Sequence, residues 1–262
     1  MGVSKPADED LARQRRDRRE IVAEIVGGEE TTEFPEAAVV GARFSSGRVQ
    51  WGGSGVLIHP RLVLTAAHVL RLDPNVVVVN AAAVTQGQSP AAGQGMMLTV
   101  KRHLIPRGAH RQPSSPNDIA LLELDQPATG VLPAKLPAAG GGLLALGDKV
   151  QIVGYGFGNP EETQGFGQKR QGCISVKELL LNKTEFRAGG GGEPDTAVGD
   201  SGGPALAGCG VAGQRTVVGV TSRSVLVSGN SGSGGIYTLV KPYMAFLEAA
   251  IQAAGTAAGG GV

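Results

Sequence analysis

The chain has 262 residues, of which 41% are apolar but only 4% aromatic, so aliphatic side chains must supply most of any core. Its 24 basic and 23 acidic residues give a net charge of +1, and no long basic cluster lies beyond the first twenty residues, so nucleic acid and anionic membranes are not expected as partners. A membrane-spanning helix needs about 18 consecutive apolar residues, and the sequence has no apolar run of that length.

Residues 1–24 form a segment that differs from the rest of the chain by its charge. It contains six basic and six acidic residues and no apolar stripe. This composition predicts a solvated arm or a propeptide. The segment also lacks the apolar centre of an export signal, so the chain either works inside the cell or naturally begins elsewhere.

Short β-branched runs follow and are separated by turn residues, as expected from a chain with 42 glycines. The spacing predicts an all-β fold of antiparallel strands. A stretch rich in Pro, Ala and Gly at 127–142 is expected to cross between two halves. Helical spacing occurs at 242–254, and residues 255–262 are expected to be a flexible tail. The predicted strands are 37–40, 49–51, 55–58, 62–65, 76–79, 97–101 and 119–124 in the first half, and 149–153, 172–176, 204–206, 217–221 and 235–240 in the second.

Three motifs carry candidate catalytic side chains. Ser201 lies among small residues in VGDSGGPA (198–205), which would let a substrate carbonyl approach the backbone. His68 ends LVLTAAH (62–68), and Asp118 begins DIALLEL (118–124). A serine hydroxyl attacks poorly unless an imidazole takes its proton and a carboxylate orients that imidazole. Each residue alone could be a turn serine, a buried histidine or a strand-end aspartate, but together they favour nucleophilic catalysis.

At these motifs the chain resembles the trypsin/chymotrypsin-like serine peptidases, in the form with few cysteines found in bacterial-type members. The family's order along the chain is His, Asp, Ser, as here. The resemblance covers about residues 25–254 and implies an all-β fold of two packed six-stranded antiparallel β-barrels (about 25–130 and 143–240) with a C-terminal α-helix. It implies a serine endopeptidase that acts on polypeptides and has no cofactor. No spacing typical of a metal site is present.

The resemblance also implies roles for residues around the nucleophile. The backbone N–H groups of Gly199 and Ser201 match the oxyanion hole. Asp200 matches the acid that pairs with a freed α-ammonium after zymogen cleavage, and Ile25 in IVGG (25–28) matches that new terminus. The cut would follow Glu24 rather than Lys or Arg, so a separate activating protease would be needed. The alternative is an uncleaved chain in which 25–28 form only a first strand and turn.

Primary specificity is implied by Asp195, six residues before Ser201, which matches the acidic floor of a pocket for Arg or Lys. Gly235 matches a glycine that keeps this pocket open, and Ser222 matches the residue that pairs with substrate backbone and supports the triad aspartate. Ser224 stands where a wall glycine is usual, and Arg223 stands where a tryptophan is usual. Asp195 as a plain loop acid remains an alternative.

Three hypotheses for the function stay open. The first is cleavage after Arg or Lys, the second is the same triad with a non-basic specificity, and the third is a non-catalytic binding module with a peptidase fold. The two cysteines, Cys173 and Cys209, do not fall on the usual family positions, so free thiols and a disulfide are equally open. Relatives of this kind are usually secreted, whereas the missing export signal leaves a cytoplasmic location open.

Overall fold

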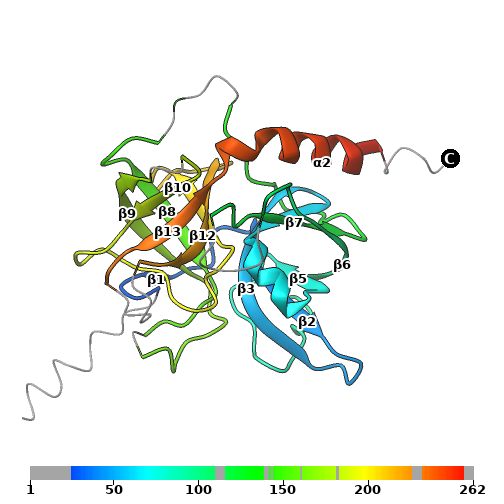
Figure 1. The fold of residues 1–262 in the computed structure, drawn as a ribbon. Coiled ribbons are helices and arrows are strands. Elements are labelled where there is room, and N and C mark those ends of the chain that lie inside the picture. Colours follow the sequence, from blue (N-terminus) through cyan, green and yellow to red (C-terminus); the bar gives the residue numbers. More distant parts are fainter. Residues whose placement is uncertain are drawn as a thin grey trace, which may run out of the picture.

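The computed structural model describes residues 25–109, 116–138, 142, 144–159, 161–180, 183–225 and 232–256. The predicted N-terminal arm, 1–24, and residues 257–262 of the predicted tail lie outside this part of the chain. The described residues form two β-barrels that lie side by side, with a C-terminal helix across them (Figure 1).

The first barrel is a closed ring of six antiparallel strands in the order β2-β3-β4-β7-β6-β5. Two predicted runs, 49–51 and 55–58, join into the single long strand β3 through the small residues between them. Every residue of the four-valine strand β5 is buried, as the unbroken β-branched run indicates. The strands are β2 (Ala37–Arg43), β3 (Val49–His59), β4 (Leu62–Thr65), β5 (Val76–Val79), β6 (Met96–Leu104) and β7 (Ala120–Leu124).

The second barrel has the strand order β9-β10-β13-β12-β11-β8 and closes through pairing of β8 with β9, while β1 (Glu29–Glu30) adds to the outside of β9. The expectation of two six-stranded antiparallel barrels is therefore confirmed. One of the six strands, β10, was not predicted from the sequence. The strands are β8 (Lys149–Gly154), β9 (Arg170–Leu179), β10 (Glu185–Ala188), β11 (Pro204–Ala207), β12 (Val217–Ser224) and β13 (Gly235–Leu239).

The C-terminal helix α2 (Met244–Thr256) follows a short 3₁₀ turn, η2 (Lys241–Tyr243). It begins and ends two residues later than predicted, so the first two residues of the predicted tail are helical. Leu247, Ala250 and Ala254 are its buried residues, and they belong to the same apolar cluster as the first barrel. The helix that follows the second barrel therefore returns to cover the first one (Figure 1). The helices of the described residues are too short or too polar to span a bilayer.

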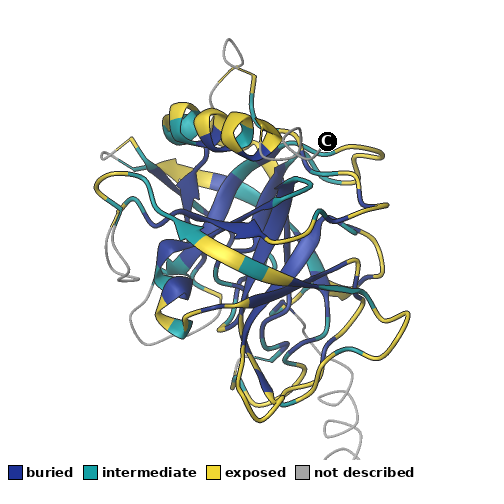
Figure 2. Ribbon diagram, turned by 90° about the vertical axis from the view of Figure 1, so that its right-hand side faces the viewer, coloured by how far each residue is buried: buried dark blue, intermediate teal, exposed yellow. Residues whose placement is uncertain are grey.

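The core is made mainly of Val, Leu, Ile and Ala, as the low aromatic content predicts. Figure 2 shows buried strands in the centre and exposed residues along the loops and the outer side of α2. The larger apolar cluster also includes Tyr155 and Leu206 of the second half, so packing between the barrels is continuous with the core of the first. This contact matters because the candidate catalytic residues come from both barrels.

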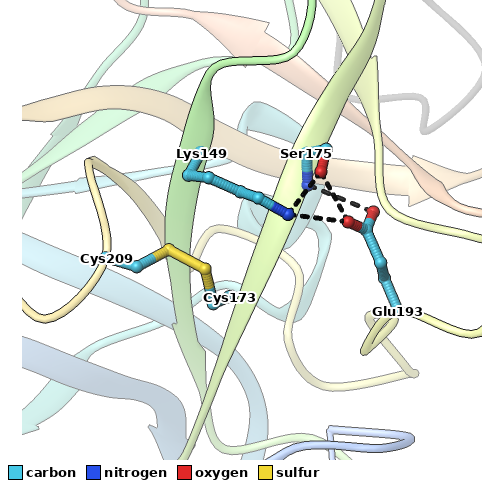
Figure 3. Close-up of a disulfide and its surroundings, with 5 residues drawn as sticks. All are labelled: Lys149, Cys173, Ser175, Glu193 and Cys209. Atoms are coloured by element: carbon cyan, nitrogen blue, oxygen red, sulfur yellow. Dashed lines mark hydrogen bonds and ion pairs between the residues drawn. A yellow bond between two sulfur atoms is a disulfide. The ribbon is translucent and has the colours of Figure 1, made fainter.

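Cys173 and Cys209 form a disulfide, with 2.10 Å between the sulfur atoms, which decides between the two alternatives left by the sequence. Cys173 is on β9, and Cys209 follows β11, next to a parallel bridge between Gly208 and Val150 of β8. The bond therefore links β9 to the segment after β11, beside β8 (Figure 3).

Candidate active site

His68 and Asp118 are joined by two hydrogen bonds although 50 residues separate them. His68 lies on a 3₁₀ turn, η1 (Ala67–Leu72), directly after β4. Its Nδ1 is 2.7 Å from Asp118 Oδ2, and its backbone N–H donates to Asp118 Oδ1 over 2.8 Å. Asp118 precedes β7, the strand that pairs with β4, so the barrel register brings the two together. The second bond holds the aspartate against the backbone of its partner, which limits rotation of both groups.

The carboxylate of Asp118 is fully buried and has further partners. Ser222 on β12 donates its hydroxyl to Asp118 Oδ2 over 2.6 Å. Thr238 Oγ1 on β13 donates to the backbone carbonyl of Asp118 over 3.1 Å. The second barrel thus holds an acid of the first barrel in place. With these bonds made, Asp118 can accept the Nδ1 proton of His68 and leave Nε2 directed toward the cleft.

Ser201 shares a cleft of about 370 Å³ with His68, Gly199 and Ser222. In the described part of the chain no hydrogen bond links Ser201 Oγ to His68 Nε2. A nucleophile and its base often come within hydrogen-bonding distance only when substrate is bound, so the lack of this bond is compatible with catalysis. A larger hollow of about 600 Å³ lies among residues 80–94, but its lining has no charged or histidine side chain. The cleft with Ser201 is therefore the candidate active site.

The glycines around Ser201 are needed for packing between the barrels. Gly202 has φ +87°, and a Cβ there would collide with Thr65 Oγ1 and the carbonyl oxygen of Ser54. A Cβ on Gly203 would collide with the carbonyl oxygen of Val153. These contacts bring the backbone after Ser201 against β3 and β4, where the Ser54 N–H donates to the Ser201 carbonyl over 2.7 Å. Ser201 is thereby fixed at the junction of the barrels.

Gly199 adopts φ +100°, a conformation that favours glycine strongly. A Cβ there would lie 2.5 Å from Phe166 Cε2 and 2.8 Å from Gly156 Cα. The Gly199 carbonyl accepts a 2.8 Å hydrogen bond from Ser54 Oγ, which in turn accepts one from the Tyr155 N–H. These contacts hold the backbone of the predicted oxyanion hole in place.

Asp200, next to Ser201, is buried and does not line the cleft. Its Oδ1 accepts the Gly156 N–H over 2.8 Å, and its Oδ2 accepts the Ala197 N–H over 2.9 Å. Burial raises its pKa to about 6, against the lowering effect of these two hydrogen bonds and of the positive charge of Arg170. A Cβ on Gly154 would collide with this carboxylate. The group is an acid that lacks full compensation for its negative charge.

Ile25 is also buried, at 1% exposure, within the apolar cluster of the second barrel. The carbonyl of the next residue, Val26, accepts a 2.8 Å hydrogen bond from the Asp195 N–H. The start of the predicted peptidase domain therefore lies against the segment that leads to Ser201.

Asp195 is buried, with 1% exposure. Its Oδ1 accepts the Thr196 N–H over 2.8 Å, and its Oδ2 accepts the N–H groups of Gly232 and Gly234 over 2.7 and 2.9 Å. Thr196 lines the cleft and Asp195 does not. A Cβ on Gly235 would lie 3.0 Å from Thr196 Oγ1, so glycine leaves free the space between them.

Arg223 and Ser224 line the cleft beyond Ser222. Arg223 Nη1 is 2.5 Å from Oε1 of the buried Glu185 on β10 and 3.3 Å from Ser222 Oγ. The pairing of β12 with β13 is irregular between Thr221 and Arg223. At this irregularity the side chains of the neighbours Ser222 and Arg223 come within hydrogen-bonding distance of each other. Arg223, at the position where a tryptophan is usual in the family, is here a cation paired with Glu185.

Several residues of this site were not found from the sequence. Ser54 supports both Gly199 and Ser201. Gly154, Gly156 and Phe166 surround Asp200 and Gly199. A polar residue inside the apolar strand β3 was the only available signal for Ser54. Among the described residues, no group of His, Cys, Asp and Glu is arranged to hold a metal ion.

Two β-barrels with His68, Asp118 and Ser201 at their junction are the arrangement typical of serine peptidases of the chymotrypsin type. The family model described as Trypsin matches residues 25–247, and the chain belongs to that family. A solved structure described as "Structure of GrC" has the same fold, with a TM-score of 0.69 and 19% identity over 86% of this chain and 99% of that one.

Named relatives include serine proteases of animals. The chain is 30% identical to vitamin K-dependent protein C of Rattus norvegicus over 75% of this chain and 45% of that protein. It is 26% identical to kallikrein-4 of Homo sapiens over 76% of this chain and 78% of that protein. With CLIP domain-containing serine protease B4 of Anopheles gambiae it shares 26% identity, over 86% and 69%. The chain thus spans less than half the length of protein C and most of the length of kallikrein-4.

Proposed function

We propose that the domain is an active serine endopeptidase. The observation that carries this proposal is the pair of hydrogen bonds between His68 and the buried Asp118, in the same cleft as Ser201. In the proposed reaction His68 accepts the Ser201 proton as the oxygen attacks the peptide carbonyl, and it returns the proton to the leaving amine. Water then releases the acyl group by the same path. Asp118 holds the imidazole and stabilises its charged form.

Charge that develops on the carbonyl oxygen would be stabilised by the N–H groups of Gly199 and Ser201. The support for this role is the fixed backbone around Gly199, held by Ser54 behind it. Donors that are already oriented need no rearrangement when the charge forms, so they stabilise the transition state more than mobile water would.

A fluorophosphonate probe tests the proposal, because only an activated serine reacts with it. The wild-type protein should be labelled at Ser201 and should hydrolyse peptide amides. Ser201→Ala and His68→Ala should each lose about 10⁴-fold or more in kcat, and the two losses should not add. Ser89→Ala, which changes an exposed loop serine, is the matched control. Wild-type protein that is folded but not labelled would instead indicate a non-catalytic binding module.

We infer a preference for Arg or Lys before the cut bond from the surroundings of Asp195. No Lys or Arg side chain among the described residues forms an ion pair with it, and three backbone N–H groups compensate its charge only in part. Tyr237 Oη is buried beside Gly235, and burial and the nearby charge of Asp195 raise the pKa of this tyrosine. A substrate cation that passes Thr196 and Gly235 would therefore meet a carboxylate and a phenol oxygen.

The change Asp195→Ser tests this specificity. It removes the charge while leaving the triad intact, so kcat/KM on an Arg substrate should fall by about 10²-fold or more relative to a matched Leu substrate, on the order of the cost of breaking a buried ion pair. Rates are referred to the concentration of labelled Ser201, which corrects for misfolded protein. An unchanged Arg-to-Leu ratio would favour the same triad with a non-basic specificity.

We also propose that cleavage after Glu24 by another protease activates the domain. The freed α-ammonium of Ile25 would then pair with Asp200. Burial of Ile25 and the incomplete compensation of the Asp200 charge, which leaves its pKa raised to about 6, support this step. The alternative is a chain that is active without cleavage.

A further inference from the structure

The segment that carries Asp195 is held on the outer face of the second barrel by a cluster of charges. Glu193, two residues before Asp195, accepts hydrogen bonds from the backbone N–H of Ser175 over 3.1 Å and from its hydroxyl over 2.5 Å. Lys149 Nζ is 3.1 Å from Glu193 Oε1, and Lys177 Nζ is 3.1 Å from Oε2. Both carboxylate oxygens are therefore engaged. Figure 3 shows Lys149, Ser175 and Glu193 together beside the disulfide.

The partners of Glu193 come from two paired strands. Lys149 on β8 is opposite Ser175 on β9, and Lys177 lies two residues further along β9, on the same face. Cys173 lies two residues before Ser175, so the disulfide and the charge cluster constrain neighbouring points of one face. Strand register thus places two lysine ammonium groups, one hydroxyl and one backbone N–H around a single carboxylate.

The four residues before Glu193 have no side chain that could hold this position and contribute only backbone hydrogen bonds. Residues 189–192 are four consecutive glycines with φ values of +76°, +78°, +67° and +92°. Glycine loses more conformational entropy on ordering than other residues, so a run of four needs an anchor at its end. Glu193 supplies the first side chain after β10 that can provide one.

The same segment sets the surroundings of Asp195. Pro194 packs against Gly172, where a Cβ would lie only 2.7 Å from the proline ring. Gly190 lies against Ser233 and Gly234, and the Gly191 N–H donates to the Gly232 carbonyl over 3.2 Å. Gly232 and Gly234 are also the donors to Asp195 Oδ2. A shift of the glycine run would therefore displace both Asp195 and two of its three donors.

We propose that Glu193, held by Lys149, Lys177 and Ser175, is a positioning residue for primary specificity: it fixes the segment 189–195 so that Asp195 faces an incoming substrate cation. The inference rests on the proposed preference for Arg or Lys. Glu193 is not expected to touch substrate, since its carboxylate lies on the outer face of β8 and β9 and is 21% exposed.

The charge state of the cluster agrees with this role. Partial burial acts to raise the pKa of Glu193, but hydrogen bonds from Ser175, Lys149 and Lys177 lower it to about 2. The carboxylate is therefore ionised at any pH at which a His-based triad works. The cluster acts as a permanent anchor and not as a switch.

The main test compares Glu193→Gln with the wild type on matched Arg and Leu substrates. All rates are expressed per Ser201 labelled by fluorophosphonate. The Arg-to-Leu ratio of kcat/KM should fall about tenfold, mainly through a higher KM for the Arg substrate, because a partly exposed charge network stabilises less than a buried one. Glu178→Gln, which removes an exposed carboxylate from β9 next to Lys177, is the matched control and should leave the ratio unchanged.

A second variant, Lys149→Met with Lys177→Met, removes the cations and keeps the glutamate. If the cluster acts as a unit, adding Glu193→Gln to this background should lower the ratio little further. Full additivity of the two changes would overturn a common anchor.

Amide hydrogen exchange provides a readout that does not depend on activity. Glu193→Gln should speed exchange in peptides that cover 189–195 and 232–234 and leave the first barrel unchanged. Unchanged exchange there would overturn the anchor. Faster exchange with an unchanged Arg-to-Leu ratio would overturn the role in specificity. A wild-type ratio near one, in labelled protein, would overturn the proposed preference for basic residues itself, while exchange would still report on the anchor.

Discussion

The proposed activation step predicts a pH dependence of stability that differs between two forms of the protein. One form begins at Met1, and the other begins at Ile25 and so has a free α-ammonium. In the first form Asp200 has its pKa raised from 3.8 to about 6 by burial. Stability that depends on the protonated carboxyl is fully present below pH 3.8 and is lost as the pH rises through about 6.

The size of this loss in unfolding free energy follows from the size of the pKa shift of Asp200. About two pKa units correspond to about 3 kcal/mol between the two protonation states. In the form that begins at Ile25, the ammonium favours the charged carboxylate, so most of this loss should disappear. The difference in unfolding free energy between the two forms should therefore grow by up to about 3 kcal/mol between pH 4 and pH 7, where the ammonium stays charged.

The assay is urea unfolding of both forms at several pH values between 4 and 7, in a Ser201→Ala background to prevent self-cleavage. Other groups of the domain titrate equally in both forms and cancel in the difference. The control is Asp200→Asn in each form. This change lowers the stability of both forms, because an amide N–H₂ then faces the N–H of Gly156 or Ala197. The difference in unfolding free energy between the two Asn variants should not change with pH. A flat difference in the proteins that retain Asp200 would refute insertion of Ile25 beside it.

Three further predictions concern single features of the site and fold. Asp118→Asn should lower kcat by about 10⁴ near pH 7 with little change in KM, because the amide favours the wrong tautomer of His68; a loss confined to KM would contradict the triad. Gly199→Ala should lower kcat by about 10²-fold or more, since a Cβ would meet Phe166 at 2.5 Å and move an oxyanion donor, and an unchanged kcat would count against the donor role. Replacing Cys173 and Cys209 by Ala should lower the unfolding free energy by about 4 kcal/mol, as expected when a cross-link spanning 36 residues is lost, and equal urea midpoints with and without the bond would show that it adds no stability.

Features encoded by short runs of residues could be predicted from the sequence. The bounds of β4 and β5 match their apolar β-branched runs, because both strands are buried throughout and their residues have little alternative to a sheet. The three candidate catalytic residues were found because small residues and apolar strands flank them in the sequence itself.

Strand β10 could not be predicted from its own residues. It has four residues, EFRA, of which two are charged, so it carries no strand signal of its own. It forms because β9 and β13 pair with it on both sides and because Phe186 stacks on Tyr237, with 5.1 Å between the ring centres. Pairing partners that are distant in sequence decided this strand.

The sequence by itself determined which residue types are available for catalysis and where most strands run, since both depend on local pattern. Only the tertiary structure decided that Cys173 bonds to Cys209, that Ser54 supports Gly199, and that Glu193 meets Lys149 and Ser175. Each of these contacts joins segments that closure and register of the barrels bring together. Barrel closure depends on the summed burial and pairing of many residues, so no single segment of the chain encodes it.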